Sequence, residues 1–405
     1  VVAASTHPDR GSEPGLGWGW VEALAAHHDL WVIIGEREGN RVAIERRLLE
    51  VPDVAAHIRV HFIPRPDGPR LERVWPLFYY SRYRRWHAQA FELASRLASE
   101  VRFDIAHQLN MTGYREPGYL WRLELPFVWG PVGGTANVPL RFAPILGPGP
   151  ACYHLAKTVV NSAQLRFHPR VRRALRRAAG FVTSNSTEHR AFLEVWDKHS
   201  RVIADTGPPL ADCQPSADSR AGSTFRIAWS GIHVSRKALP LVLRSVARLP
   251  PTLDWHLDIV GDGPMSDRWK ALAATLGLDA RCTWHGWLPT PTARAIVGRA
   301  DVLAFLSLHE GMPTVVMEAL AMGVPVVCLD LCGQGDIVDD SCGIKIAPTS
   351  VRATVDACAS ALLALAGDTR ERARLSAGAA RRSRAFNWAA KASAMNAVYR
   401  EALGR

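Results

Sequence analysis

One stretch of the chain, residues 302–329, constrains the fold most because it reads as a strand, a turn, a helix and a second strand. Its two ends, residues 302–306 and 326–329, are short apolar runs typical of buried strands. Between them, Pro313 suits the first position of a helix and Gly323 suits its end. Strands and helices alternate in the same way on both sides of this stretch. The sequence therefore predicts an α/β fold.

Two glutamates lie beside the start of this predicted helix, Glu310 in the turn before it and Glu318 near its second turn. A helix N-terminus offers free N–H groups and a partial positive charge, which suit a phosphate. Gly311 allows the backbone to approach a ligand because it has no side chain. Carboxylates on each side of such a seat can each bind a pair of vicinal hydroxyls. For an isolated pair, a solvated turn residue and an exposed helix residue remain the simpler interpretation.

The length of the chain predicts more than one domain. A chain of 405 residues is too long for one ordinary core and suggests two domains of about 200 residues each. Residues 207–223 are rich in Pro, Ser, Asp and Ala and show no periodicity, so they are the predicted linker. The first domain is then residues 1–206 and the second is residues 224–387.

The second domain resembles the retaining glycosyltransferases of family 4, which have the GT-B fold of two Rossmann-like domains facing across a cleft. Glu310 and Glu318 stand seven residues apart within an EG…EA…G-P-V frame similar to the signature of that family. The loop that begins at Gly231 resembles the family's donor-phosphate loop, with Lys237 at its lysine position. Ile232 stands where relatives have arginine. Arg236 is a candidate replacement, although adjacent side chains are not expected to point the same way.

The resemblance implies a binding site for a nucleotide-sugar donor, and it covers the second domain more specifically than the first. Residues 286–288 match the place where relatives position the base through backbone contacts. The last helix, residues 388–405, is expected to cross back to the first domain. The implied donor-binding residues are Gly15, Gly17, Gly231, Arg236, Lys237, Gly286, Trp287, Leu288, Glu310, Gly311, Met312, Pro313, Thr314 and Glu318.

In the first domain, Gly15 and Gly17 are placed in a glycine-rich loop after the first strand, where relatives close over the donor diphosphate. A tight turn without a ligand is the alternative. A dinucleotide-binding fingerprint with Glu36 as the ribose-binding acid is a weak second alternative, because Trp20 replaces the third glycine. His107 ends a predicted strand within a D-[IV]-x-H-like element. It is expected to face the transferred sugar or the acceptor.

The reaction implied by the resemblance is transfer of a sugar from a nucleoside diphosphate to a hydroxyl acceptor, with its α configuration retained. The implied catalytic residues are Glu310, Lys237 and His107. Glu310 is expected to bind the sugar hydroxyls, Glu318 the ribose hydroxyls, and Lys237 the diphosphate. No Asp-X-Asp element occurs, so neither a metal nor another cofactor is expected. No persuasive nucleophile is present, which favours a same-face mechanism in which the leaving phosphate accepts the acceptor proton.

Charge and cysteine content bear on partners and location. The net charge is +11, and basic stretches run from Arg65 to His87, among aromatic residues, and from Arg166 to Arg177. Either stretch suits an anionic membrane surface, or a helix whose arginines face water. The seven cysteines are scattered, and no transmembrane or secretory segment is recognised. We expect a cytoplasmic protein, peripheral on the membrane if these stretches bind it, that takes part in polysaccharide, glycolipid or other glycoconjugate synthesis.

Two other functions remain open. One is a different GT-B catalyst, such as a sugar phosphorylase or nucleotide-sugar epimerase, which needs no separate hydroxyl acceptor. The other is a basic protein that binds membranes or nucleic acid, with an affinity that falls steeply with salt. Nucleic acid is not the expected partner, because Glu310, Glu318 and Lys237 are all present.

Overall fold

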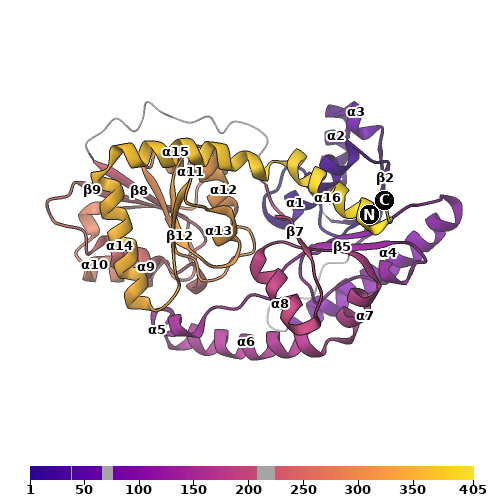
Figure 1. The fold of residues 1–405 in the computed structure, drawn as a ribbon, viewed down its shortest axis with the longest axis horizontal. Coiled ribbons are helices and arrows are strands. Elements are labelled where there is room, and N and C mark those ends of the chain that lie inside the picture. The colour runs from indigo at the N-terminus through magenta and orange to yellow at the C-terminus, as the bar shows by residue number, and fades with distance from the viewer. Residues whose placement is uncertain (38, 66–75, 208–223) are drawn as a thin grey trace. The chain divides into compact units, whose positions relative to one another are not determined.

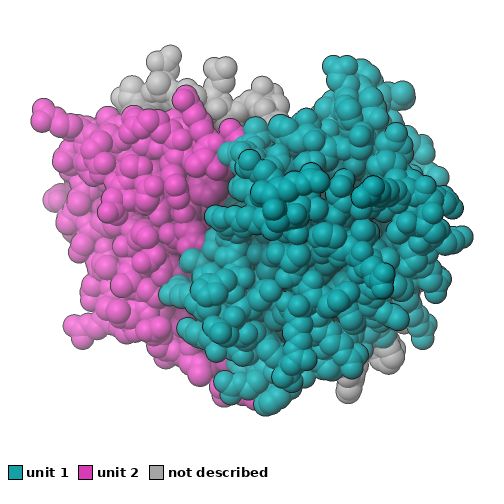
Figure 2. Space-filling view, turned by 45° about the vertical axis from the view of Figure 1, so that its right-hand side comes forward, with its two compact units in different colours: residues 1–135, 162–205, 388–405 teal, residues 136–161, 206–387 magenta. Residues whose placement is uncertain are grey.

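The computed structural model describes residues 1–37, 39–65, 76–207 and 224–405. It contains two compact units (Figures 1 and 2). Unit 1 comprises residues 1–135, 162–205 and 388–405, and unit 2 comprises residues 136–161 and 206–387. The last segment thus groups with unit 1, whereas residues 136–161, which we had assigned to the first domain, group with unit 2. Residues 208–223 of the predicted linker lie outside the described residues.

Unit 1 is built on a sheet in which the strands of the described residues all run parallel, in the order β3-β2-β1-β4-β5-β6-β7. The strands are β1 Val2–Ala3, β2 Leu30–Glu36, β3 Ile58–Pro64, β4 Ala106–Asn110, β5 Phe127–Val132, β6 Ala178–Thr183 and β7 Arg201–Val202. The helices are α1 Ser12–Ala25, α2 Asn40–Glu50, α3 Pro52–Ala55, α4 Pro76–Glu100, α7 Pro169–Arg177, α8 Ser186–Trp196 and α16 Trp388–Ala402. Buried apolar side chains cover both faces of the sheet, as a parallel sheet requires.

Unit 2 is built on a second parallel sheet, in the order β10-β9-β8-β11-β12-β13 within the described residues. The strands are β8 Phe225–Ser230, β9 Trp255–Val260, β10 Cys282–Gly286, β11 Val302–Phe305, β12 Val326–Leu329 and β13 Gly343–Ile346. The helices are α5 Ala143–Leu146, α9 Leu239–Val246, α10 Ser266–Thr275, α11 Thr290–Gly298, α12 Thr314–Ala321, α13 Cys332–Ile337, α14 Val351–Gly367 and α15 Thr369–Ser383. Helix α6, Pro148–Phe167, begins in unit 2 and ends in unit 1.

Each sheet has a topological switch point, where the strand order reverses. In unit 1 it lies between β1 and β4, and in unit 2 between β8 and β11. Ligands of open parallel sheets bind outside the carboxyl ends of the strands at such points. The loops that follow β8 and β11 are therefore the first places to look for a site in unit 2.

Residues 136–161 join unit 2 because they supply apolar side chains to its core. Phe142, Ile145 and Leu146 are buried in one cluster with Trp229 and Leu241. The sequence showed an apolar stretch but not the sheet that it covers. A sequence-order boundary between the domains therefore missed this segment.

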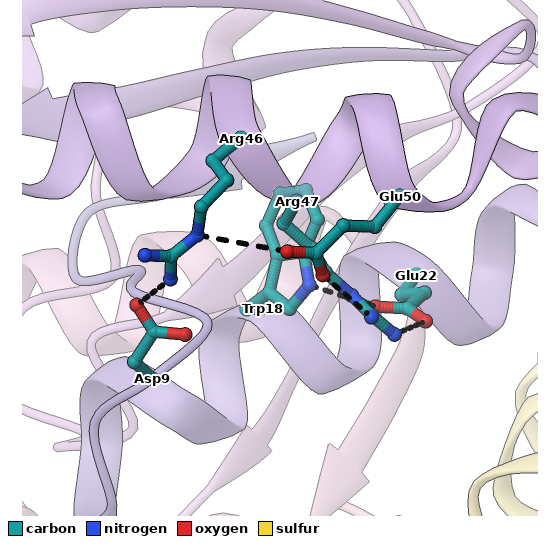
Figure 3. Close-up of polar contacts among 6 residues, drawn as sticks. All are labelled: Asp9, Trp18, Glu22, Arg46, Arg47 and Glu50. Atoms are coloured by element: carbon teal, nitrogen blue, oxygen red, sulfur yellow. Dashed lines mark hydrogen bonds and ion pairs between the residues drawn. The ribbon is translucent and has the colours of Figure 1, made fainter.

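Some arginines of unit 1 form ion pairs with carboxylates of the same unit (Figure 3). Arg47 of α2 donates to both carboxylate oxygens of Glu22 on α1, at 2.8 and 3.3 Å, and to Glu50 at 3.2 Å. The indole of Trp18 donates to Glu22 at 2.8 Å, and Arg46 pairs with Asp9 and Glu50. These contacts tie α2 to α1 and to the loop before it.

Helix α16 closes unit 1 at the end of the chain, and Figure 1 shows it beside α1. Gly19 of α1 permits this contact, because a Cβ there would lie 2.2 Å from the ring of Trp388. None of the helices in the described residues is long and apolar enough to span a membrane.

Candidate functional site

The candidate site is centred on Glu310, in the loop that follows β11 at the switch point of unit 2. One carboxylate oxygen, Oε1, lies 2.8 Å from Nζ of Lys237 and 3.0 Å from a guanidinium nitrogen of Arg236. The hydroxyl of Ser307 donates to the same oxygen at 2.6 Å. Glu310 is only 8% exposed. The loop after β8 and the loop after β11 thus meet at one charged group.

Arg236 and Lys237 converge on Glu310 although they are adjacent in the sequence. They form a 3₁₀ turn, Ser235–Lys237, in which successive side chains leave the axis about 120° apart. Both side chains are long enough to bend back to one oxygen, and Arg236 also donates to the carbonyl of His309 at 2.8 Å. Our expectation that adjacent side chains would point apart was therefore wrong at this turn.

The two loops are also joined through their backbones. The carbonyl of Arg236 accepts from the amide of Leu308 at 2.8 Å, and the hydroxyl oxygen of Ser307 lies 3.2 Å from that carbonyl. The side chain of Lys237 packs beside Gly231, where a Cβ would be in ordinary contact at 3.5 Å, and above the ring of Phe305 at 4.9 Å. The position of the cations is thus fixed by loop contacts as well as by charge.

The charges around Glu310 set its protonation. Burial raises the pKa of the Glu310 carboxyl, but Lys237 and Arg236, with the hydrogen bonds from Lys237 and Ser307, outweigh it, so the pKa lies below its usual value. Glu310 is therefore ionised at neutral pH. It neutralises cations that would otherwise attract an anionic ligand.

Helix α12 starts beside this cluster. Its first residue is Thr314 and Pro313 is the N-cap, so the predicted start was one residue too early. The end matches the prediction: Gly323 has a φ of +68°, and the amides of Gly323 and Val324 bond back to Leu320 and Ala319. A Cβ at Gly333 of α13 would lie 1.9 Å from the carbonyl oxygen of Gly311, so glycine there lets the site loop lie against α13.

Glu318, the second signature carboxylate, has a cationic partner that the sequence did not reveal. Arg294 of α11 donates from Nε at 3.0 Å and from a terminal nitrogen at 2.8 Å, and both bonds end on Oε1 of Glu318. The side chain of Glu318 keeps 16% of its surface exposed. Glu310 and Glu318 are thus each held by arginine or lysine, from different elements.

The predicted base-binding segment, residues 286–288, lies at the carboxyl end of β10. Gly286 has a φ of +67°, and its carbonyl accepts from the amide of Gly261 at 2.9 Å. The indole of Trp287 is 72% exposed. The segment therefore offers backbone groups at the end of a strand and an uncovered aromatic ring.

Residues 136–161 also contribute to the surroundings of this site. His154 of α6 lies 3.2 Å from the hydroxyl of Ser235, which precedes Arg236. Burial, together with the charges of Lys157 of α6 and Arg236, lowers the pKa of His309 to about 4. The sequence gave no signal for this contribution, because it depends on the packing of α6.

The structure places the predicted site residues of the first domain differently. His107 is the second residue of β4 rather than its end, and it is fully buried. Its Nδ1 lies 2.6 Å from the hydroxyl of Tyr399 and its Nε2 lies 2.7 Å from the carbonyl of Gly130. Burial lowers its pKa to about 3. His107 is thus a neutral internal residue with both ring nitrogens hydrogen-bonded within unit 1, and its contact with a sugar or acceptor stays a prediction.

Gly15 and Gly17 also differ from the prediction, because both lie inside α1 rather than in a loop. A Cβ at Gly15 would lie 2.0 Å from the carbonyl of Arg10, and one at Gly17 would lie 2.2 Å from the carbonyl of Ser5. They allow the helix to pack closely on the preceding loop. Glu36, the acid of the dinucleotide alternative, is paired with Arg41 at 2.6 Å.

The basic stretches of unit 1 are partly internal. Within the described part of the stretch from Arg65 to His87, the side chains of Arg65, Tyr83, Trp86 and His87 are buried, and Arg65 stacks on Tyr83 at 4.1 Å. Residues 66–75 lie outside the described residues. The stretch from Arg166 to Arg177 contains α7, most of whose arginines are exposed.

The family model of glycosyl transferases group 1 matches residues 222–382, which contain all the site residues of unit 2. Curated relatives also match over part of the chain. The lipopolysaccharide core biosynthesis glycosyltransferase LpsE of Rhizobium meliloti is 32% identical over 135 residues, 33% of this chain and 38% of the relative. The 2-deoxystreptamine glucosyltransferase of Streptomyces kanamyceticus is 30% identical over 188 residues, 42% and 49% of the two chains. The match thus spans less than half the length of each relative.

Solved structures match over nearly the whole chain. HepE of Anabaena in complex with UDP superposes with a TM-score of 0.64 at 17% identity, covering 98% of this chain and 97% of the other. WaaG, a glycosyltransferase involved in lipopolysaccharide biosynthesis, superposes with a TM-score of 0.60 at 15% identity and 98% coverage of both. At such identity the likeness shows the fold, which is the two-domain GT-B fold that the sequence predicted.

Proposed function

We propose that the protein is a retaining glycosyltransferase that moves a sugar from a nucleoside diphosphate to a hydroxyl, and the match of residues 222–382 to the group 1 glycosyl transferases supports this proposal. One observation carries the proposal: Glu310 sits between Lys237 and Arg236, at 2.8 and 3.0 Å, beside the start of α12. This arrangement places a carboxylate for sugar hydroxyls next to cations for a diphosphate, at the switch point where open sheets bind ligands.

The difficult event in such a transfer is departure of the nucleoside diphosphate. Negative charge develops on its β-phosphate as the bond to the anomeric carbon breaks. Lys237, Arg236 and the first-turn N–H groups of α12 are fixed before the reaction and can stabilise that charge. These groups supply the positive charge that a metal ion supplies in other enzymes, so we propose that the reaction needs no metal.

The proton balance favours a same-face mechanism. The acceptor oxygen bonds to the anomeric carbon, the bond from that carbon to the phosphate oxygen breaks, and the leaving phosphate takes the acceptor proton. Glu310 is ionised and held by three donors, which suits binding of sugar hydroxyls better than nucleophilic attack. The anomeric configuration of the product, measured by NMR, tests retention. An unchanged rate in excess EDTA tests metal independence.

The proposal also includes the kind of acceptor and a contact with a membrane surface. Relatives are named for lipopolysaccharide core biosynthesis, and we propose a glycan or glycolipid acceptor at the cytoplasmic face of a membrane. Arg172, Arg173 and Arg176 of α7 are exposed, as is Phe167, at 74%. Such a surface attracts anionic lipid. Sedimentation with anionic but not neutral vesicles, lost when these arginines are changed to Glu, is the expected result.

The first experiment is thermal unfolding with UDP, GDP, TDP and ADP, for the wild type and Glu318→Ala. A ligand that binds only the native state raises the melting temperature by mass action. We expect one nucleotide to raise it in the wild type and much less in the variant. No shift with any nucleotide at millimolar concentration would overturn the proposal and favour a basic binding protein. A nucleotide-dependent shift with turnover but no hydroxyl acceptor would favour a phosphorylase or epimerase.

A further inference from the structure

The contact between Arg294 and Glu318 is unsymmetrical. Arg294 lies on α11 and Glu318 on α12, and two guanidinium nitrogens bond to the same oxygen, Oε1, at 3.0 and 2.8 Å. Oε2 has no hydrogen-bond partner among the residues that the structure describes. One carboxylate oxygen is thus fixed to a neighbouring helix, and the other is left for a ligand.

A fixed carboxylate matters because a glutamate on a helix surface normally samples several rotamers. Ordering a long side chain costs conformational entropy. A guanidinium with two donors holds the carboxylate before a ligand arrives, so ligand binding does not have to order the side chain. The side chain of Arg294 is 28% exposed, so the pair is partly shielded from water.

We propose that Arg294 is a positioning residue that holds Oε1 of Glu318 so that Oε2 meets a ribose hydroxyl of the donor nucleotide. The proposal rests on the proposed function, because it assumes that Glu318 faces the ribose. Its consequence is selectivity: the site distinguishes a ribonucleotide from its 2′-deoxy counterpart, and that discrimination depends on Arg294. An arginine that only tied α11 to α12 would affect stability but not this discrimination.

The test is calorimetric titration with UDP, GDP and ADP, each compared with its 2′-deoxy counterpart. A lost hydrogen bond to a charged group corresponds to roughly a tenfold or greater loss of affinity. We expect the wild type to bind one ribonucleotide about tenfold more tightly than its deoxy counterpart. Arg294→Met should bring that ratio close to one, and Arg294→Lys, which keeps one donor group, should give an intermediate ratio.

Two comparisons separate positioning from a structural role. In the Glu318→Gln background, Arg294→Met should not change the ratio further, because the residue acts through Glu318. Arg299→Met is the matched control: Arg299 follows α11, is exposed, and its side chain forms no hydrogen bond or ion pair with the described residues. It should leave the ratio at the wild-type value. If Arg294→Met is too unstable to titrate, Arg294→Lys gives the same readout.

The outcomes distinguish the two proposals. Ribonucleotide binding with an unchanged ratio in Arg294→Met or Arg294→Lys would overturn the positioning role and leave the proposed function standing. A ratio that changes equally in Arg299→Met would also overturn it. No binding of any nucleotide to the wild type would overturn the proposed function, and this inference with it.

Discussion

The two sheets have the same strand order around their switch points, but the side chains at the two switch points differ. In unit 2 the loops after β8 and β11 bring Lys237, Arg236 and Glu310 to the carboxyl edge. In unit 1 the corresponding place, between β1 and β4, holds Asn110, whose side chain bonds to the amide and carbonyl of Ser5 at 3.1 and 2.6 Å. One edge carries two cations that share one carboxylate. The other is occupied by an amide that satisfies the backbone.

The strand order thus sets where a ligand site can form, and the side chains at that place determine whether a ligand binds there. Lys237 and Glu310 are largely buried charges, which are costly unless a ligand or a partner charge is present. Asn110 is neutral, 3% exposed and fully engaged with its neighbours. We therefore expect substitutions at the unit 2 edge to change donor chemistry, and substitutions at the unit 1 edge to change stability.

The largest effect is expected for Glu310→Gln. Loss of one fixed charge at a reacting centre lowers turnover by about 10²–10³-fold. Nucleotide binding should persist or tighten, because Glu310 competes with the diphosphate for Lys237 and Arg236. Initial rates and calorimetric titration of the nucleoside diphosphate check both parts.

Glu318→Gln is the control for this prediction, since it should weaken nucleotide binding instead. Parallel losses of nucleotide affinity in the two variants would contradict the division of roles between the carboxylates. Circular dichroism must show that both variants are folded, because Gln at residue 310 leaves Lys237 without its counter-charge.

A second, smaller effect separates the two cations. Lys237 has 11% of its side chain exposed and Arg236 has 34%, so the charge of Lys237 is less screened by water. We expect Lys237→Met to weaken nucleotide binding about tenfold and Arg236→Met to weaken it less. In the Arg236→Met background, Ile232→Arg should restore affinity if Arg236 replaces the arginine found at that position in relatives. A larger loss in Arg236→Met would reverse the assignment.

The sequence predicted the strand, turn and helix that carry the unit 2 site because these elements are local. A strand, a turn that contains Glu310, a helix and a terminating glycine follow one another between residues 302 and 323. Each of them can be predicted from the residues close to it in sequence. The lysine loop after β8 is equally local. The structure then adds what local rules do not contain: the hydroxyl of Ser307 on Glu310, and Arg294 on Glu318 from a helix more than twenty residues away in sequence.

The sequence was a weaker guide to unit 1 and to the domain boundary. Gly15 and Gly17 suggested a loop, but backbone carbonyls pack against them and the segment is helical. His107 was placed at a strand end because the strand was read as too short, and three more residues make it internal. Residues 136–161 were assigned by order along the chain, whereas apolar contacts place them in the core of unit 2.

The smallest effect on donor chemistry is expected at the unit 1 switch point. Asn110→Ala removes two hydrogen bonds and leaves the amide and carbonyl of Ser5 without that partner, a loss of about 1–3 kcal/mol in the free energy of unfolding. Affinity for the nucleoside diphosphate should stay at the wild-type value, because the donor site is built in unit 2. Denaturant unfolding and calorimetric titration measure the two quantities on one preparation. A large loss of affinity with little loss of stability would show that the unit 1 edge also binds the donor, and the contrast between the two switch points would not hold.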